Sequence, residues 1–174
     1  KHYIDCARYL LERAFTHVIH GATSASAALN QESPEEMFGT ILDGTRHLLE
    51  QLTPRPPERL LLLSSGAVYG PQPPELARMP ESFPGGPDPL EPGSAYGEGK
   101  RAAEHLATLW ARRTGTGLVV ARPFAFVGPG LPLDIHFAVG NFLRDALAGR
   151  PIRVKGDGTP LRSYLHAADL AAWL

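Results

Sequence analysis

The residues best suited to proton transfer are Tyr96 and Lys100, which lie four positions apart in the sequence. In a helix this spacing places both side chains on one face. A lysine ammonium beside a phenol favours the phenolate, which is the form that accepts a proton. A serine hydroxyl, from Ser65 or alternatively from Ser64, follows the apolar run Leu60 to Leu63 earlier in the chain. We therefore predict a proton-transfer site built from a serine, Tyr96 and Lys100.

The elements that must hold these residues alternate between strand and helix. Apolar or β-rich segments that end in small residues predict strands at 16–23, 59–64, 118–123 and 152–154. Helical periodicity and start signals predict helices at 34–52, 96–114 and 137–148, and another near Asp169. The inner face of the first helix is predicted to carry Met37, Ile41, Thr45, Leu48, Leu49 and Leu52. This alternation indicates an α/β fold with a parallel sheet, whose carboxyl edge binds the ligand.

The composition limits the classes of binding partner and the cellular compartment that we expect for this protein. The 174 residues suffice for one domain with a core, and a formal net charge of −1 without a basic block argues against nucleic-acid or anionic-membrane binding. Cys6 is the only cysteine and no apolar run is long enough to span a bilayer, so we expect a cytoplasmic protein without disulfides. Cysteine and histidine spacing predicts no metal site. The eight prolines of 70–93 predict a long irregular loop with a function.

Five motifs in this order resemble the extended short-chain dehydrogenase/reductase family, in its nucleotide-sugar epimerase/dehydratase branch. They are HGAT at 20–23, SSGAVYG at 64–70, Y-x-x-x-K at 96–100, ARPFAFVGPG at 121–130 and GDG with RSYLHAADL within 156–170. The resemblance covers about residues 18–174. It implies a Rossmann-like doubly wound parallel sheet, NAD as cofactor with NADP as an alternative, a nucleotide-sugar substrate and a homodimer.

The resemblance also assigns roles to individual residues. Tyr96 would be the general base and acid, Lys100 would tune it and bind the nicotinamide ribose, and Ser65 would bond the sugar 4-oxygen. The cofactor-binding residues implied are Ala22, Thr23, Ser64, Tyr96, Lys100, Pro123 and Phe124. The substrate-binding residues implied are Ser65, Ala125, Asn141 and Arg162. Residues 1–130 would form part of the cofactor-binding domain, and residues 131–174 part of a small nucleotide-sugar-binding region.

Three departures from the family pattern shape the functional hypothesis. The Gly-rich turn that holds the cofactor pyrophosphate is not in the sequence, so we expect an N-terminally truncated Rossmann-like fold. Gly66 and Ala67 stand where dehydratases and decarboxylases of the family carry acidic residues, which favours 4-epimerisation through a transient 4-keto sugar. Ala125 and Val127 replace the usual asparagine and tyrosine, so one common sugar contact is missing.

Other interpretations of these residues stay open. A reductase of a nucleotide 4-keto-sugar would use the same residues, a 4,6-dehydratase-like enzyme is a further alternative, and a non-catalytic fragment or nucleotide-sugar-binding module is the alternative of another class. Ser65 could instead cap a turn, and Arg162 could be a solvated cation. We expect structural roles for five residues: His20 and His166 as hydrogen-bonded framework, Tyr69 in packing, Arg122 in an ion pair and Asp169 as a helix cap. The role of His136 is left open.

Overall fold

A parallel three-stranded sheet forms the framework of the first part of the chain. In the computed structural model, which describes residues 13–23, 26–134, 138–154, 156–158 and 162–174, its strands are β1 (His17–His20), β2 (Arg59–Leu63) and β3 (Gly117–Ala121). They lie in the order β1-β2-β3, all parallel, and Ile19, Leu61 and Val119 form one row across them. The predicted α/β class with a parallel sheet is confirmed.

The chain divides into two compact units, Lys1–Pro123 and Phe124–Leu174. The first contains the three-stranded sheet with its helices, and the second contains a strand pair with two further helices. The sequence-based division after residue 130, into a cofactor-binding domain and a nucleotide-sugar-binding region, stays a prediction.

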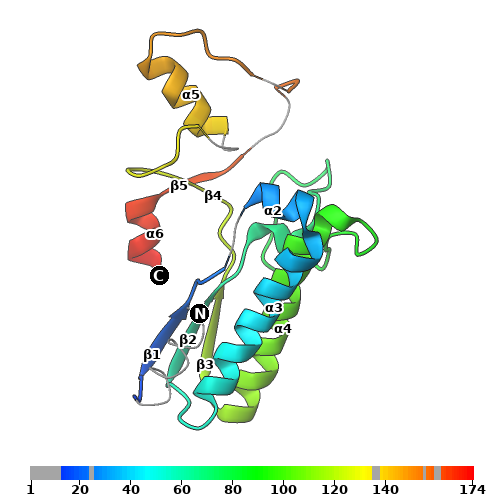
Figure 1. Ribbon diagram of the computed structural model, residues 1–174, viewed down its shortest axis with the longest axis vertical. Coiled ribbons are helices and arrows are strands. Elements are labelled where there is room, and N and C mark those ends of the chain that lie inside the picture. The colour runs from blue at the N-terminus through cyan, green and yellow to red at the C-terminus, as the bar shows by residue number, and fades with distance from the viewer. Residues whose placement is uncertain (1–12, 24–25, 135–137, 155, 159–161) are drawn as a thin grey trace. The chain divides into compact units, whose positions relative to one another are not determined.

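Two long helices lie side by side against one face of the sheet (Figure 1). They are α3 (Pro34–Leu52) and α4 (Ala95–Thr114). Proline at the first position of α3 has the backbone angle that a helix needs, and acidic residues fill the first turn, where the helix dipole favours them. α4 ends at Gly115, which adopts a φ of 79° and donates its N–H to the Ala111 carbonyl oxygen. Both helices match the predicted ranges to within one residue.

Alternating side chains of the strands form the core between the sheet and these helices. The buried cluster consists of Leu49, Leu52, Leu60, Leu62, Ala107, Trp110 and Ala111. The polar group of the buried Trp110 has a hydrogen-bond partner, because its indole N–H donates to the hydroxyl of Thr53 at 3.0 Å. The predicted inner face of α3 is confirmed, with five of its residues buried and Leu48 partly buried. On the opposite face of the sheet, Ile19 and Val119 are 64% and 54% exposed.

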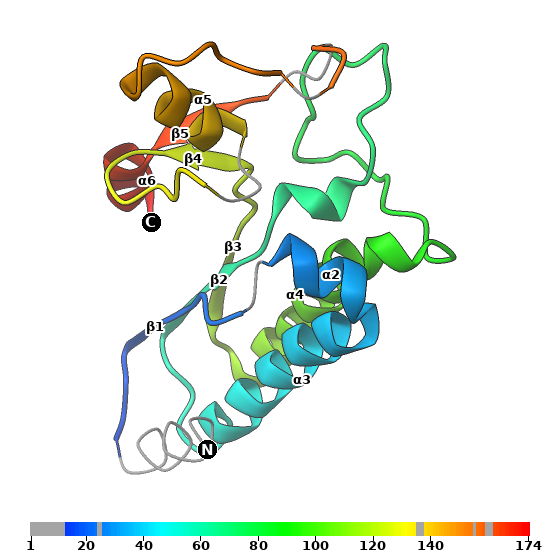
Figure 2. The same cartoon turned by 45° about the horizontal axis from the view of Figure 1, so that its top comes forward.

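The two short strands of the second unit were not predicted from the sequence, and neither were three short helical elements. The helical elements are the helix α2 (Ala27–Glu32) and the 3₁₀ turns η1 (Gly66–Tyr69) and η2 (Pro92–Ser94). Each is six residues or fewer, too short for helical periodicity to emerge. Figure 2 shows α2 next to the first turn of α4.

The proline-rich segment 70–93 is irregular up to η2, as predicted, and is attached to α4. Arg101 of α4 donates to the carbonyl oxygens of Val68, at 3.1 Å, and Gly85, at 2.9 Å. Gly70 begins the segment with a φ of 70°, and a Cβ atom there would collide with the backbone of Gly86. Glycine is therefore required at this turn.

The second unit pairs β4 (Ala125–Val127) with β5 (Tyr164–His166) in parallel, and adds α5 (Ala138–Leu147) and α6 (Ala167–Trp173). The predicted strand at 152–154 is wrong, since these residues are irregular and have no strand partner within the described part of the chain. The predicted cap of α6 also needs correction. His166, not Asp169, occupies the cap position, and its Nδ1 accepts from the Ala168 N–H.

A charged cluster lies at the C-terminal end of α5. Asp145 bonds Arg144 at 3.2 Å and Arg150 at 3.0 Å. The hydrogen bond from Arg144, assisted by Arg150, holds the pKa of the Asp145 carboxyl below its usual value.

Within the described ranges, no helix combines the length and apolar character needed to cross a bilayer. The same residues contain no group of three or more His, Cys, Asp or Glu side chains arranged for a metal ion.

Candidate active site

Lys100 is buried one turn into α4 and points at the end of β2. Its ammonium donates to the main-chain oxygen of Leu63 at 2.8 Å and lies 5.9 Å from the centre of the Tyr96 ring. The side chains thus share one face of the helix, as their spacing predicts. Burial lowers the pKa of Lys100, while the carboxylate of Glu104 opposes that change. One hydrogen bond leaves an ammonium with two further protons, enough to bond a phenolate and a ligand hydroxyl.

Ser65 lies two residues after the end of β2 and caps the turn η1. Its hydroxyl oxygen accepts from the Ala67 N–H at 3.1 Å, so the turn-capping role considered from the sequence is present. A hydroxyl that accepts a bond in this way still has its own proton to donate. The cap therefore fixes the Ser65 side chain and leaves it able to bond a substrate oxygen.

The start of α4 approaches η1 closely because residue 97 is glycine. A Cβ atom at Gly97 would lie 2.9 Å from the Ala67 carbonyl oxygen and 2.7 Å from Pro87. Any larger residue would push the first turn of α4, which carries Tyr96, away from the turn that follows Ser65. Gly97 therefore sets how closely these two segments can approach.

Ser64 has a different role from Ser65. It is buried and its hydroxyl donates to the Glu104 carboxylate at 2.5 Å. With its proton engaged by a permanent partner, Ser64 is less suited to substrate chemistry than Ser65. This contact makes Ser65 the better candidate of the two serines.

Glu104 connects α4 to the end of β3. Arg122 forms a two-pronged ion pair with it, through Nε at 3.0 Å and Nη2 at 2.7 Å. The hydrogen bond to Glu104 is the main reason that the pKa of Arg122 is raised above its usual value. The Arg122 guanidinium also lies over the buried ring of Tyr69, 4.9 Å from its centre. The predictions of an ion pair for Arg122 and a packing role for Tyr69 are confirmed.

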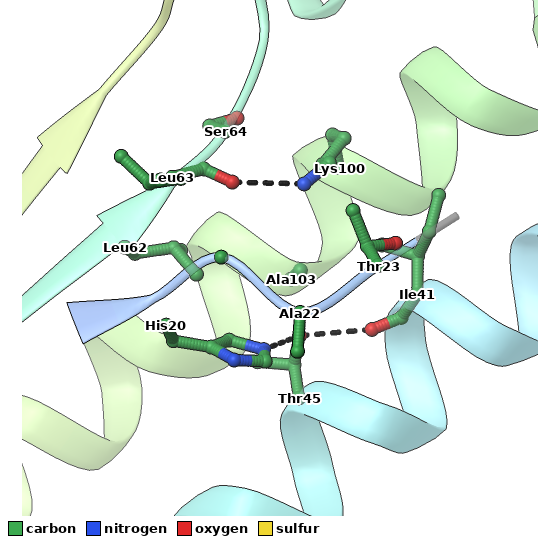
Figure 3. Close-up of a pocket in the computed structure, with 11 residues that line it drawn as sticks. His20, Ala22, Thr23, Ile41, Thr45, Leu62, Leu63, Ser64, Lys100 and Ala103 are labelled. Atoms are coloured by element: carbon green, nitrogen blue, oxygen red, sulfur yellow. Dashed lines mark hydrogen bonds between the residues drawn. The ribbon is translucent and has the colours of Figure 1, made fainter. Parts of the chain in front are cut away.

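A pocket opens at the carboxyl edge of the sheet between β1, β2 and the two long helices (Figure 3). Its lining includes Ala22, Thr23, Ser64 and Lys100, four residues predicted to bind the cofactor. The hydroxyl of Thr23 is buried and has no hydrogen-bond partner among the described residues. An unsatisfied buried hydroxyl is costly, and a ligand with polar groups, such as a dinucleotide, would satisfy it. The Thr23 hydroxyl and the Lys100 ammonium could therefore bond polar groups of such a cofactor.

His20 lies on the wall of this pocket as a neutral framework residue. Thr45 donates its own hydroxyl proton to the Ile41 carbonyl oxygen at 2.8 Å, so its oxygen accepts from His20 Nε2 at 3.1 Å (Figure 3). Burial, and secondarily the positive charge of Lys100, lowers the pKa of His20 to about 4. Its expected role as hydrogen-bonded framework is confirmed, and so is that of His166 as the cap of α6.

The remaining predicted site residues fall in two places. Pro123 belongs to the first unit, and its carbonyl oxygen accepts from the Gly66 N–H at 2.8 Å, beside Ser65. The other four, in the second unit, are Phe124, Ala125, Asn141 and Arg162. Phe124 is 59% exposed, Ala125 lies in β4, and Asn141 lies on α5. Their roles stay predictions, and His136 lies outside the described residues.

Sequence reasoning missed three residues that shape the site. The position of Glu104 beside Lys100 could have been predicted from the sequence, since an acid four positions after Lys100 lies on the same helix face. Gly97 had a weaker signal, because glycine is unfavourable inside a helix and often marks a close approach. Asn30, which bonds the backbone of Tyr96, had none, because this contact joins segments 66 positions apart.

Comparison with known proteins agrees with this geometry. The NAD dependent epimerase/dehydratase family matches residues 3–174. UDP-glucuronic acid decarboxylase 5 of Arabidopsis thaliana is 35% identical over 153 residues, which are 88% of this chain and 44% of that protein.

Solved structures show the same fold. UDP-glucose 4-epimerase of Thermotoga maritima matches with a TM-score of 0.84 and 25% identity, over 98% of this chain and 54% of that one. The Thermus thermophilus UDP-glucose 4-epimerase, solved in complex with NAD, matches with a TM-score of 0.80 and 30% identity. The match covers 98% of this chain and 55% of that one. The chain thus spans about half the length of these relatives. The Rossmann-like fold predicted from the sequence is confirmed, and the chain belongs to the NAD dependent epimerase/dehydratase family.

Proposed function

We propose that this chain carries the catalytic residues of an NAD(P)-dependent nucleotide-sugar 4-epimerase. The observation that carries the proposal is the buried Lys100 ammonium, which lies beside Tyr96 and bonds the end of β2, two residues before the capped hydroxyl of Ser65. General base catalysis at neutral pH needs a group poised to take a proton and a neighbour that stabilises its charged form. Tyr96 and Lys100 meet both needs.

Each residue has one task in this proposal. Tyr96 takes the proton from the sugar 4-hydroxyl and later returns one to the 4-oxygen. Lys100 stabilises the phenolate, and Ser65 donates a hydrogen bond to the same sugar oxygen. NAD, when bound, supplies the group that accepts and returns the hydride of sugar C4. Ala22, Thr23, Ser64 and Lys100 would hold it at the pocket between β1 and β2, where the Thr23 hydroxyl lacks a partner among the described residues.

The turn after Ser65 favours epimerisation over elimination or decarboxylation. Gly66 and Ala67 begin η1, and its first turn contains no acidic residue. By the family resemblance, members that lose water or CO₂ carry acidic residues at these positions, whereas Gly66 and Ala67 have no titratable group. The similarity to a UDP-glucuronic acid decarboxylase makes decarboxylation the competing activity to test.

The test is product analysis with the whole protein. We would incubate it with NAD and, separately, UDP-galactose, UDP-glucuronic acid and dTDP-glucose, and identify the products by chromatography. We expect conversion of a nucleotide sugar to its 4-epimer without net change in NAD. A pentose product with release of CO₂ would replace our proposal by decarboxylation, and a 4-keto-6-deoxy product by dehydration. In a separate incubation with a nucleotide 4-keto sugar and NADH or NADPH, stoichiometric oxidation of the cofactor would replace it by reduction.

A variant and a binding measurement complete this test. Tyr96→Phe should leave NAD binding intact and lower turnover by about 10²-fold or more, because it removes the proton acceptor. Unchanged turnover in that variant contradicts the assignment of Tyr96. Failure of the folded protein to bind NAD in a calorimetric titration would instead favour a non-catalytic module.

We further propose that the whole enzyme is a homodimer. The support for this is the family resemblance, and on α4 only one large apolar side chain among the described residues, Leu109, is exposed, at 52%. Sedimentation equilibrium would test this, and a monomer at assay concentration contradicts it.

A further inference from the structure

We propose that Asn30 is a positioning residue that holds Tyr96 in place from a neighbouring helix. Its side-chain oxygen accepts from the Tyr96 backbone N–H at 2.9 Å. Its side-chain nitrogen donates to the Gly93 carbonyl oxygen, also at 2.9 Å. One amide group thus bonds the first turn of the helix that carries Tyr96 and the end of the loop before it.

The need for this contact follows from the start of α4. The first N–H groups of any helix lack partners within the helix. Ser94 occupies the position that normally caps the helix, but its backbone is already helical, with φ −78° and ψ −7°, and its side chain forms no capping bond. Asn30 supplies the missing acceptor from α2. It therefore acts as the cap of α4 although it lies far away in the sequence.

Packing and a hydrogen bond hold α2, which carries this cap, in place. Leu29, the residue before Asn30, packs on the buried cluster of Met37, Ile41 and Ala103, and Tyr96 packs on the same cluster. The Leu29 N–H is in turn held by the hydroxyl of Ser26, the cap of α2. The α2 backbone is therefore anchored to the same core as the side chain it positions.

The consequence for catalysis is geometric. A backbone N–H held at one point fixes where the first turn of α4 begins, and hence where the Tyr96 hydroxyl lies relative to Ser65. Misplacement of a reacting group by about 1 Å can cost about 10²-fold in rate. Without Asn30, the first turn of α4 can fray, because terminal turns with unsatisfied N–H groups are the least stable part of a helix.

Three variants test the inference, which rests on the proposed function. Asn30→Ala removes both hydrogen bonds without adding bulk and favours helix formation in α2. Asn30→Asp keeps an oxygen for the Tyr96 N–H and adds a negative charge that suits a helix start, but it loses the donor to the Gly93 carbonyl oxygen. Gln31→Ala changes the neighbouring exposed residue and serves as the matched control.

The measurements are kcat and KM for UDP-galactose with the whole enzyme at saturating NAD, and the midpoint of thermal unfolding. For Asn30→Ala we expect a fall in kcat of about tenfold to hundredfold with KM changed by less than about threefold, because binding groups are untouched. Asn30→Asp should recover most of that loss, and Gln31→Ala should match the parent.

Several outcomes overturn the inference. One is kcat of Asn30→Ala within about twofold of the parent enzyme. Another is a lower unfolding midpoint with unchanged kcat, which would make Asn30 a residue of stability only. A third is no recovery in Asn30→Asp. Tyr96→Phe separates the two proposals: if it keeps full turnover, the proposed function fails, whereas an inactive Tyr96→Phe beside a fully active Asn30→Ala refutes the role of Asn30 alone.

Discussion

The ammonium of Lys100 donates a hydrogen bond to the main-chain oxygen of Leu63, the last residue of β2. This bond connects the helix that carries the candidate base to the strand that leads to Ser65. It also fixes the charged end of a flexible side chain in a buried position, which a lysine in water would not adopt. The candidate catalytic groups are thus held in relation to one another by the backbone of the sheet.

Replacement of Lys100 by methionine should abolish most of the activity. Lys100→Met removes the charge that stabilises the phenolate and leaves the Leu63 oxygen without its donor, so we expect turnover to fall by about 10²-fold or more. Steady-state assays with UDP-galactose and NAD would measure this. Arg112→Met, at the exposed end of the same helix, is the control and should keep normal turnover. Comparable loss in both variants would argue for a general effect on α4.

Glu104 should contribute strongly to stability. Glu104→Gln weakens the two-pronged bond with Arg122 and the bond from Ser64, in a site where the carboxylate side chain is only 13% exposed. Breaking a largely buried pair costs about 2–4 kcal/mol of unfolding free energy. Glu98→Gln, whose partner Arg101 is 3.9 Å away and 42% exposed, should cost less than about 0.5 kcal/mol. Urea denaturation of both variants measures the difference, and equal losses contradict the role given to Glu104.

His20 should make the protein less stable in mild acid. Its pKa is 6.5 in the unfolded chain and about 4 in the folded one, so between these values the unfolded state binds more protons. Stability should fall as the pH drops from about 6.5 to 4, by on the order of 2–3 kcal/mol from this residue. His20→Gln keeps a side-chain N–H for Thr45 but cannot titrate. Denaturation at several pH values should show a flatter profile for this variant, and an unchanged profile would refute the assignment.

Gly97 should be essential for turnover. Gly97→Ala places a methyl group against the Ala67 oxygen and Pro87, which displaces the first turn of α4, so we expect kcat to fall by about tenfold to hundredfold. Gly93→Ala is the matched control, because a Cβ atom there meets nothing within 4 Å. The thermal unfolding midpoint shows whether Gly97→Ala is folded, and normal kcat in a folded variant would show that the close approach is not needed.

Much of the fold could be predicted because its signals are local. Periodicity, Pro34 and Gly115 fixed the two long helices to within one residue, and the apolar run before Ser64 marked a buried strand. The segment 152–154 had the composition of a strand, yet a strand also needs a partner, which composition does not reveal. The short turns η1 and η2 depend on Ser65 and on packing against α4, which leave little trace in hydropathy.

The candidate site could be predicted only in part for a similar reason. The Tyr96 and Lys100 pair depends on spacing within one helix, so the sequence contains it. Asn30 and the contact of Gly97 with Ala67 depend on which distant segments meet. Similarly, the choice between Ser64 and Ser65 became clear only when Glu104 was found beside the first of them.

The attachment of segment 70–93 through Arg101 has an evolutionary consequence. Arg101 binds the backbone just before this segment, at Val68, and within it, at Gly85, from the helix that carries the candidate base. Residues 71–80, between these two points, can be lengthened, shortened or exchanged while both anchors stay in place. The fold thereby separates an anchored frame from a region open to diversification. Descendants of one ancestral enzyme could acquire new surfaces there without rebuilding their proton-transfer chemistry.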